Sequence, residues 1–138
     1  MDEFNLDRFL TAQDPIYTQV RAELAAGAKR TLWMWFIFPQ IAGLGVSPTA
    51  RFYAIASRAE AAAYLAHSIL GHRLLECTSL VNAVSGKSAR AIFGAPDDLK
   101  FRSSMTLFAH TAPDQPAFRE AFEKYFQGAP DQATLDRL

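Results

Sequence analysis

An unbroken run of seven large apolar residues, from Leu32 to Phe38, restricts this chain's fold more than any other feature. The run contains both tryptophans and stops at Pro39. It is far shorter than the roughly 20 apolar residues that span a bilayer, so we expect a buried segment and no membrane association. Trp, Phe and Ile favour a strand, but no segment alternates with period two, and a lone strand would lack partners. We therefore predict a short buried helix within residues 31–38, ended by the proline.

Helix signals recur along the rest of the chain. Asp14-Pro15 and Ser47-Pro48 each combine a capping residue with a first-turn proline, which predicts helices over residues 15–26 and 48–56. Ser57 and Glu60 have the spacing of a capping box. Further helices are predicted after an Asn5 cap, over residues 57–66, 69–83 and 88–93, from Asp97 or Asp98 through Phe108, and within residues 116–127 and 130–138. The predicted fold class is all-α: a single compact domain, residues 1–138, of about seven to nine short helices.

The composition excludes several classes of function. Fourteen basic residues balance fourteen acidic ones, so no overall charge favours nucleic acid or an anionic membrane. Cys77 is the single cysteine, which excludes an intrachain disulfide, and we expect it to be a buried structural thiol. The three histidines form no pattern with zinc spacing, so we predict no metal and no other cofactor. The acidic, polar first residues are unlike a signal peptide, and we expect a cytoplasmic monomer.

The loop after the apolar run is the first candidate binding site. Gly43 and Gly45 allow backbone N–H groups to turn toward a ligand, and Ser47 starts the next predicted helix. The start of a helix carries unpaired N–H groups and partial positive charge, and Arg51 lies one turn further on. Together these groups suit a phosphate or a carboxylate. A tight loop that needs glycine only for its turns explains the same pattern, because the sequence is neither a Walker motif nor a dinucleotide fingerprint.

A second candidate is the helix predicted to begin at Asp97 or Asp98. Lys100 and Ser104 share one of its faces, and Arg102 lies on another. Cations and hydroxyls suit an anion or a sugar, whereas a solvated helix face with two acids at its N-terminus would give the same pattern. If a hydrolytic step occurs, Asp97 or Asp98 is the predicted general base.

The apolar run and its edge complete the candidate site. Trp33 and Trp35 offer flat rings for stacking on a planar ligand such as a nucleobase, although a run this apolar places at least one of them in the core. Gln40 follows the proline, where it is either a group that hydrogen-bonds the polar edge of a ligand or an ordinary loop residue. The aromatic stretch within residues 116–127 offers a different surface, one for protein partners if its side chains are exposed.

Several blocks of the sequence carry a resemblance to a known family. They are Trp33-Met34-Trp35-Phe36-Ile37-Phe38-Pro39-Gln40, Gly43-Leu44-Gly45, Glu60-Ala61 with Tyr64-Leu65, Leu70-Gly71 with Arg73-Leu74, Phe93-Gly94, and Asp97-Asp98-Leu99-Lys100 with Ser103-Ser104-Met105-Thr106-Leu107-Phe108. With them the chain resembles a bacterial domain-of-unknown-function family, number eighteen-ten, whose members are sometimes mislabelled calpastatin. The resemblance covers nearly the whole chain and implies a single all-α domain without an established activity.

The same resemblance has one departure and one distant connection. The family pattern usually has a histidine just before Trp33, where this chain has Leu32, so no catalytic histidine is carried over. The family is in turn distantly similar to the NADAR group, which is linked to NAD and ADP-ribose metabolism. Analogy of fold and motif is weak evidence for function.

Two functional hypotheses follow from these residues. In the first, the chain binds or acts on a small phosphorylated, nucleotide-like ligand of the NAD or ADP-ribose type in a polar pocket. In the second, it is a non-catalytic protein-interaction or regulatory domain. Convergence of Gln40, Arg51 and Lys100 in one cleft would favour the first hypothesis, and an exposed aromatic surface would favour the second. The sequence leaves open whether any catalysis occurs.

Overall fold

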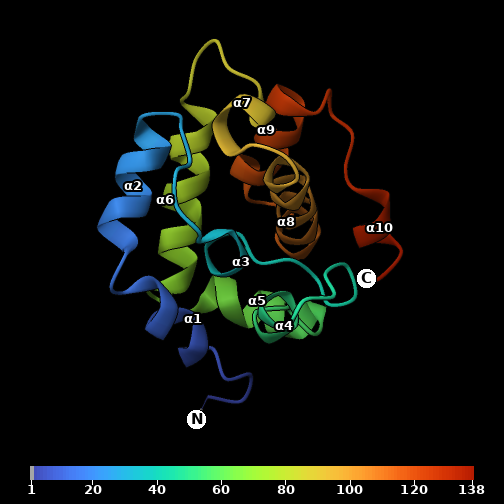
Figure 1. The fold of residues 1–138 in the computed structure, drawn as a ribbon. Coiled ribbons are helices and arrows are strands. Elements are labelled where there is room, and N and C mark those ends of the chain that lie inside the picture. The colour runs from blue at the N-terminus through green and yellow to red at the C-terminus, as the bar shows by residue number, and fades with distance from the viewer. Residues whose placement is uncertain (1) are drawn as a thin grey trace.

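The computed structural model describes residues 2–138 and folds them into ten helices joined by short loops (Figure 1). The helices are α1 (Asp7–Gln13), α2 (Tyr17–Ala25), α3 (Met34–Ile37), α4 (Pro48–Phe52), α5 (Arg58–Ala66), α6 (Leu70–Asn82), α7 (Ala89–Phe93), α8 (Asp97–Thr111), α9 (Pro116–Tyr125) and α10 (Gln132–Leu135). Every segment that the sequence predicts as helical contains one of them, which confirms the all-α fold class. The count exceeds seven to nine because even the shortest predicted segments form a turn of helix.

Helix α8 is the centre of the fold. It packs against α3, α5, α7, α9 and α10, and Figure 1 shows these helices arranged around it. All six residues from Ser103 to Phe108 are buried, so this part of the helix is covered on every side. Phe101 meets Phe38 edge-on with 5.0 Å between ring centroids, and Phe108 packs on Tyr64 at 5.6 Å. This packing fixes the first turn of α8, where the charged candidate residues lie.

Four residues of the apolar run form the predicted short helix, which is only partly buried: Trp35 and Phe36 are half-buried, and Leu32, at the start of the run, is 78% exposed. Helix α3 is a single turn, with Met34 and Ile37 facing the core. Beyond its end, the Ile55 N–H donates to the Gln40 carbonyl at 2.8 Å, and the Ala42 N–H donates to the Ile55 carbonyl at 2.8 Å. These two bonds form an isolated parallel bridge. They place the loop after Pro39 alongside the chain that leaves α4.

Three of the predicted serine caps are confirmed. Ser47, Ser57 and Ser88 accept hydrogen bonds from the backbone N–H groups three residues further on, at 3.0 to 3.1 Å. These bonds satisfy donors that a helix N-terminus leaves unpaired. The predicted capping box at Ser57 is only half formed, because the carboxylate of Glu60 accepts from the Ala56 N–H instead of the serine's own N–H.

The predicted acidic and amide caps are wrong. Asp14 ends α1, and α2 begins two residues later than predicted with Ile16 as its N-cap, because the Asp14 N–H continues the α1 ladder to Leu10. Asn5 does not cap α1, because the carboxylate of Asp2 accepts the N–H groups of Leu6 and Asp7 instead. The N-cap of α8 is Pro96, without a side-chain bond. Asp97 and Asp98 lie inside the first turn of α8, where their charges face other partners.

Candidate functional site

A hollow between α3 and α4 joins two segments that the sequence singled out. Its outer part has a volume of about 480 Å³ and is lined by Trp35, Phe36, Pro48, Thr49, Phe52 and Tyr53. Its inner part is a recess of about 10 Å³ lined by Trp35, Gln40, Ile41, Gly45, Ala50, Tyr53 and Ala54. Because Trp35 and Tyr53 line both parts, we treat them as one site and call it the aromatic cleft. The outer part has the volume of a ligand pocket but is shallow and widely open to solvent, and the inner part has room for about one water molecule.

Half-buried aromatic rings and one exposed ring, that of Phe52, form the wall of the aromatic cleft. The Tyr53 ring lies 5.3 Å from that of Phe36 and 4.9 Å from that of Phe52. Phe52 is 55% exposed although it is large and apolar. Rings held in this way by other rings lose little freedom when a further planar group stacks on them. The cleft is therefore suited to a flat, partly apolar ligand.

Arg8 fixes the position of the α4 wall. Its guanidinium donates to the carbonyls of Phe52 and Ala54 at 2.8 and 2.9 Å, and to the carboxylate of Glu60 at 2.7 Å. Both side chains of the ion pair are nearly buried, 9% exposed for Arg8 and 4% for Glu60. Sequence reasoning missed Arg8, because its partners lie more than 40 residues away in the chain.

A cluster of charges lies beside the cleft at the first turn of α8. The ammonium of Lys100 is 5.0 Å from the centroid of the Trp35 ring and 3.1 Å from one carboxylate oxygen of Asp97. The other oxygen of Asp97 is 2.9 Å from the ammonium of Lys29, which lies 5.2 Å from the Trp33 ring. We call Lys29, Asp97 and Lys100 the charge cluster. Two cations share one carboxylate, and both lie against tryptophan rings.

Trp33 is a core residue, and it is fixed by an acid that the sequence did not reveal. The ring is 1% exposed, and its Nε1–H donates to the carboxylate of Glu23 at 2.9 Å. The same carboxylate accepts from the Arg30 N–H, from the N–H and hydroxyl of Thr31 and from the Gln19 amide. Burial alone would raise the pKa of Glu23, but these hydrogen bonds outweigh it and lower the pKa to about 2.

The structure brings some of the predicted site residues together. Trp35, Gln40 and Gly45 line the inner recess, whereas Lys100 lines neither part of the cleft and is connected to it only through the Trp35 ring. The expected convergence of Gln40, Arg51 and Lys100 in one cleft is therefore not found. Asp97 joins this group through its pair with Lys100. The aromatic run and the start of α8 therefore meet, although more than 60 residues separate them in the sequence.

Other predicted residues of the glycine loop lie outside the aromatic cleft. Gly43 is exposed and lies under Arg137, whose Nε would be 2.7 Å from a Cβ at that position. The hydroxyl of Ser47 is already used by the N–H of Ala50. Arg51 is exposed and lines neither part of the cleft. The loop thus contributes one of its glycines to the cleft, and its predicted phosphate-binding groups point elsewhere or are occupied.

The predicted polar residues of α8 do not form one face: Arg102 contacts the C-terminal segment, and Ser104 lies in the core. Arg102 donates to the Ala129 carbonyl at 2.9 Å and lies over the Phe126 ring. Ser104 is fully buried, and neither its hydroxyl nor the Oδ1 oxygen of Asp98 has a hydrogen-bond partner among residues 2–138. Neither side chain lines the cleft.

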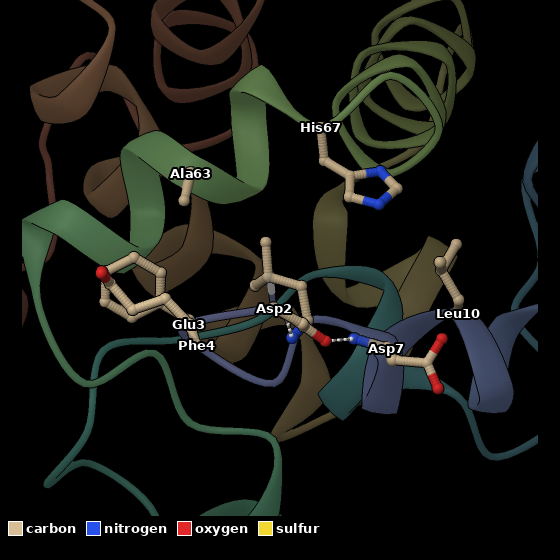
Figure 2. A pocket seen from close by; sticks show the side chains of 8 residues that line it. Asp2, Glu3, Phe4, Asp7, Leu10, Ala63 and His67 are labelled. Atoms are coloured by element: carbon tan, nitrogen blue, oxygen red, sulfur yellow. Dashed lines mark hydrogen bonds between the residues drawn. The ribbon is translucent and has the colours of Figure 1, made fainter.

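A second hollow, of about 490 Å³, lies at the N-terminus (Figure 2). Its polar groups serve the local backbone. The carboxylate of Asp2 accepts the N–H groups of Leu6 and Asp7, and these bonds lower its pKa. Nδ1 of His67 accepts the N–H groups of Ile69 and Leu70 at 3.1 and 3.2 Å. These groups cap helices α1 and α6, so their geometry is explained without a ligand.

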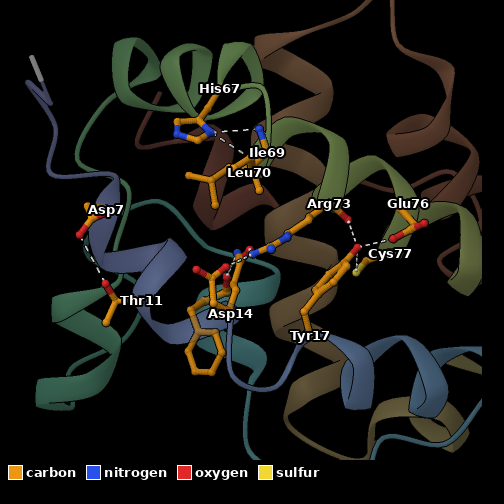
Figure 3. A network of polar contacts seen from close by, with 12 residues as sticks. Asp7, Thr11, Asp14, Tyr17, His67, Ile69, Leu70, Arg73, Glu76 and Cys77 are labelled. Atoms are coloured by element: carbon orange, nitrogen blue, oxygen red, sulfur yellow. Dashed lines mark hydrogen bonds and ion pairs between the residues drawn. The ribbon is translucent and has the colours of Figure 1, made fainter.

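A polar network joins α1, α2 and α6 (Figure 3). The Tyr17 hydroxyl donates to Glu76 at 2.6 Å, and Arg73 pairs with Asp14 at 2.8 Å. Cys77 lies 3.7 Å from the Tyr17 hydroxyl and is buried, which raises the pKa of its thiol to about 12. At neutral pH the thiol is protonated and a poor nucleophile. The expectation of a buried structural thiol is confirmed.

The aromatic surface expected on residues 116–127 is largely absent. Phe118 is 0% and Phe122 is 7% exposed, and Phe126 is half-buried. Helix α9 directs these rings toward α6 and α8, because its apolar positions repeat at helical spacing. Helix α9 therefore lacks the exposed aromatic surface that would have supported a protein-interaction domain.

Together, the fold and the cleft describe a small all-helical protein with an aromatic site beside a charged helix start. The chain matches over residues 3–138 the family described as "Protein of unknown function (DUF1810)", and it belongs to that family. It is similar to the conserved hypothetical protein Rv1873 from Mycobacterium tuberculosis, for which a crystal structure exists. The two sequences are 53% identical, the match covers 99% of this chain and 98% of that chain, and the structures superpose with a TM-score of 0.98. No curated protein matches the chain.

These comparisons do not show the similarity to the NADAR group that the sequence resemblance suggested. Neither description names an activity, a ligand or a partner. Within residues 2–138, no helix has both the length and the apolar character that crossing a bilayer requires. The same part of the chain has no group of three or more potential metal-binding side chains. The function must therefore be inferred from the geometry of the cleft.

Proposed function

We propose that this chain binds a small, planar, negatively charged ligand of the nucleotide type in the aromatic cleft. One observation carries the proposal: Trp35 lines the cleft while the ammonium of Lys100 lies against its ring. A single residue thereby connects a stacking surface with a positive charge. Nucleotide-like molecules combine a flat ring with an anionic group, and aromatic stacking with a nearby cation is how proteins bind them without a dedicated fold.

Each part of the ligand has a proposed partner. The ring stacks against Trp35 on the side of Phe52 and Tyr53, where the hollow is wide enough. The side chain of Gln40 lines the recess below, so its amide hydrogen-bonds the polar edge of the ring. Lys100 contacts the anionic group. We further propose that the protein does this as a cytoplasmic monomer without a metal or other cofactor.

The proposal is one of binding and assigns no catalytic step. A general base must reach the proton that it abstracts and must have a free lone pair. Asp97 has both oxygens engaged by ammonium groups, and neither Asp97 nor Asp98 lines the cleft. Asp98 keeps one oxygen without a partner. That oxygen is buried and does not line the cleft, so neither predicted acid meets both requirements.

Binding is tested by titrating the protein with ADP-ribose, NAD and AMP while following heat release and thermal unfolding. A ligand present at about 100 times its dissociation constant stabilises the protein by about 2.7 kcal/mol, which corresponds to about 8 °C in Tm. The absence of any shift or heat with all three compounds would overturn the proposal.

The Trp35→Ala protein is expected to bind these compounds about 5- to 150-fold more weakly, because stacking of one base on an aromatic ring contributes about 1–3 kcal/mol. Trp35→Phe keeps a ring and is expected to retain most of the affinity. Leu99→Ala, an exposed apolar residue one position before Lys100, is the matched control and should bind as the wild type does. Equal affinities for Trp35→Ala and the control would place the ligand elsewhere.

A further inference from the structure

We propose, on the basis of the function above, that the charge cluster selects ligands whose anionic group carries one negative charge over those with a doubly charged terminal phosphate. Phosphodiesters, the phosphates of a pyrophosphate linkage, and carboxylates belong to the first class. Terminal phosphate monoesters belong to the second. Asp97 is the residue that determines this specificity.

The first step concerns Lys29, which is sealed away from the ligand. Its side chain is 7% exposed, its ammonium is 2.9 Å from Asp97, and the Trp33 ring covers it. The charge of Lys29 is therefore used inside the protein and balances that of Asp97. With so little of its side chain exposed, Lys29 is not available to a ligand in the aromatic cleft.

The second step concerns Lys100, which lines neither part of the cleft but lies against the Trp35 ring that does. Its side chain is 26% exposed, more than those of Lys29 and Asp97. With Lys29 and Asp97 balanced, the cluster offers one uncompensated positive charge at the cleft. One negative charge on the ligand neutralises it.

The third step concerns the second charge of a phosphate monoester. That charge would have no cation left in the cluster, and it would be repelled by the carboxylate of Asp97, only 3.1 Å beyond the Lys100 ammonium. Asp98, the next residue on α8, adds further negative charge at the same helix end. Partly buried charges are weakly screened by salt, so the repulsion persists at physiological ionic strength. Arg51 is exposed and lines neither part of the cleft, so solvent weakens its effect.

The test compares two probes that differ by a single charge. AMP carries two negative charges at pH 7.5, and its 5′-methyl phosphate ester carries one, with the same base and sugar. We expect the wild-type protein to bind the ester about tenfold more tightly than AMP in calorimetric titrations. Lowering the pH to 5.5 protonates AMP to a monoanion, so the ratio of the two dissociation constants should approach one.

The Asp97→Asn protein is expected to lose the preference, because the repelling charge is gone while the amide still accepts from Lys29. Asp114→Asn removes an acid from an exposed loop and is the matched control, with an unchanged ratio. A wild-type protein that binds AMP as tightly as the ester overturns this inference and leaves the proposed function intact. An unchanged ratio in Asp97→Asn overturns the role of Asp97. If neither probe binds, the proposed function fails as well. Should Asp97→Asn fail to fold, the wild-type ratio and its pH dependence decide.

Discussion

The Glu23→Ala protein is expected to unfold about 12 °C below the wild type, a loss of about 4 kcal/mol in the free energy of unfolding. The carboxylate of Glu23 is 3% exposed and accepts from the indole N–H of Trp33 and from two backbone N–H groups. Without it, the indole N–H of Trp33 stays buried without an acceptor, and the partly buried N–H groups of Arg30 and Thr31 lose a charged one. Each unsatisfied buried donor costs about 1–3 kcal/mol, and more where the lost partner is charged. Thermal unfolding followed by circular dichroism measures the change.

Gln19→Ala is the matched control for this result. Gln19 lies on the same helix and donates to the same carboxylate at 2.9 Å, but it is exposed. Its loss leaves no buried group unpaired, so we expect the free energy of unfolding to change by less than about 1 kcal/mol. A Glu23→Ala protein that differs from the wild type by no more than the control would show that the loop before α3 is fixed by apolar packing alone.

The carboxylate of Glu23 also makes the free energy of unfolding depend on pH. Folding lowers the pKa of Glu23 from 4.5 to about 2, so its ionised form stabilises the native state above pH 4.5 and the stabilisation is lost as the pH falls toward 2. The unfolding free energies of wild type and Glu23→Gln, measured in urea, should therefore differ by about 2 kcal/mol less at pH 3 than at pH 6. A difference that does not change with pH would contradict the lowered pKa, and other acids cancel because both proteins contain them.

The sequence predicted the helices and their serine caps well and the acidic and amide caps poorly, for a physical reason. Helical spacing of apolar residues is a repeated local signal, and a serine cap such as Ser47 depends only on neighbours three residues away. An acidic residue can satisfy other partners instead. Asp97 pairs with Lys29, which lies 68 positions earlier in the chain. Asp2, before the first predicted helix, supplies the cap that Asn5 was expected to provide.

Some residues of the aromatic cleft were predicted from the sequence and others were not. The difference is whether the residues that meet are close together or far apart in the chain. Trp35, Gln40 and Gly45 lie within one short segment whose turns the proline and glycines determine, so local reasoning brought them together. Lys100 meets them only because α8 is central to the fold. Nothing local distinguished Glu23 from a solvent-exposed acid on an amphipathic helix, since its five donors come mainly from the loop that follows.

The Arg8→Met protein is expected to lose about 4 kcal/mol of stability and the ordered conformation of helix α4. Removing the guanidinium leaves the carboxylate of Glu60 as a buried charge without its ion-pair partner, which typically costs about 3–5 kcal/mol. It also leaves the carbonyls of Phe52 and Ala54 without their donor. Urea unfolding measures the stability, and amide hydrogen exchange at residues 52–55 reports on the α4 wall.

Two further variants separate the contribution of the Arg8–Glu60 ion pair from that of the hydrogen bonds between Arg8 and the backbone carbonyls. Arg58→Met removes an exposed arginine that donates to the His110 carbonyl, and we expect it to cost less than about 1 kcal/mol. In the Arg8→Met/Glu60→Gln protein the uncompensated charge is gone, so the double variant should be less destabilised than the sum of the two single variants by about 2 kcal/mol. If the effects simply add, Arg8 acts through its carbonyl contacts. In either case, variants whose α4 amides exchange faster with solvent should also bind the ligand more weakly, because Phe52 and Tyr53 form the wall of the aromatic cleft.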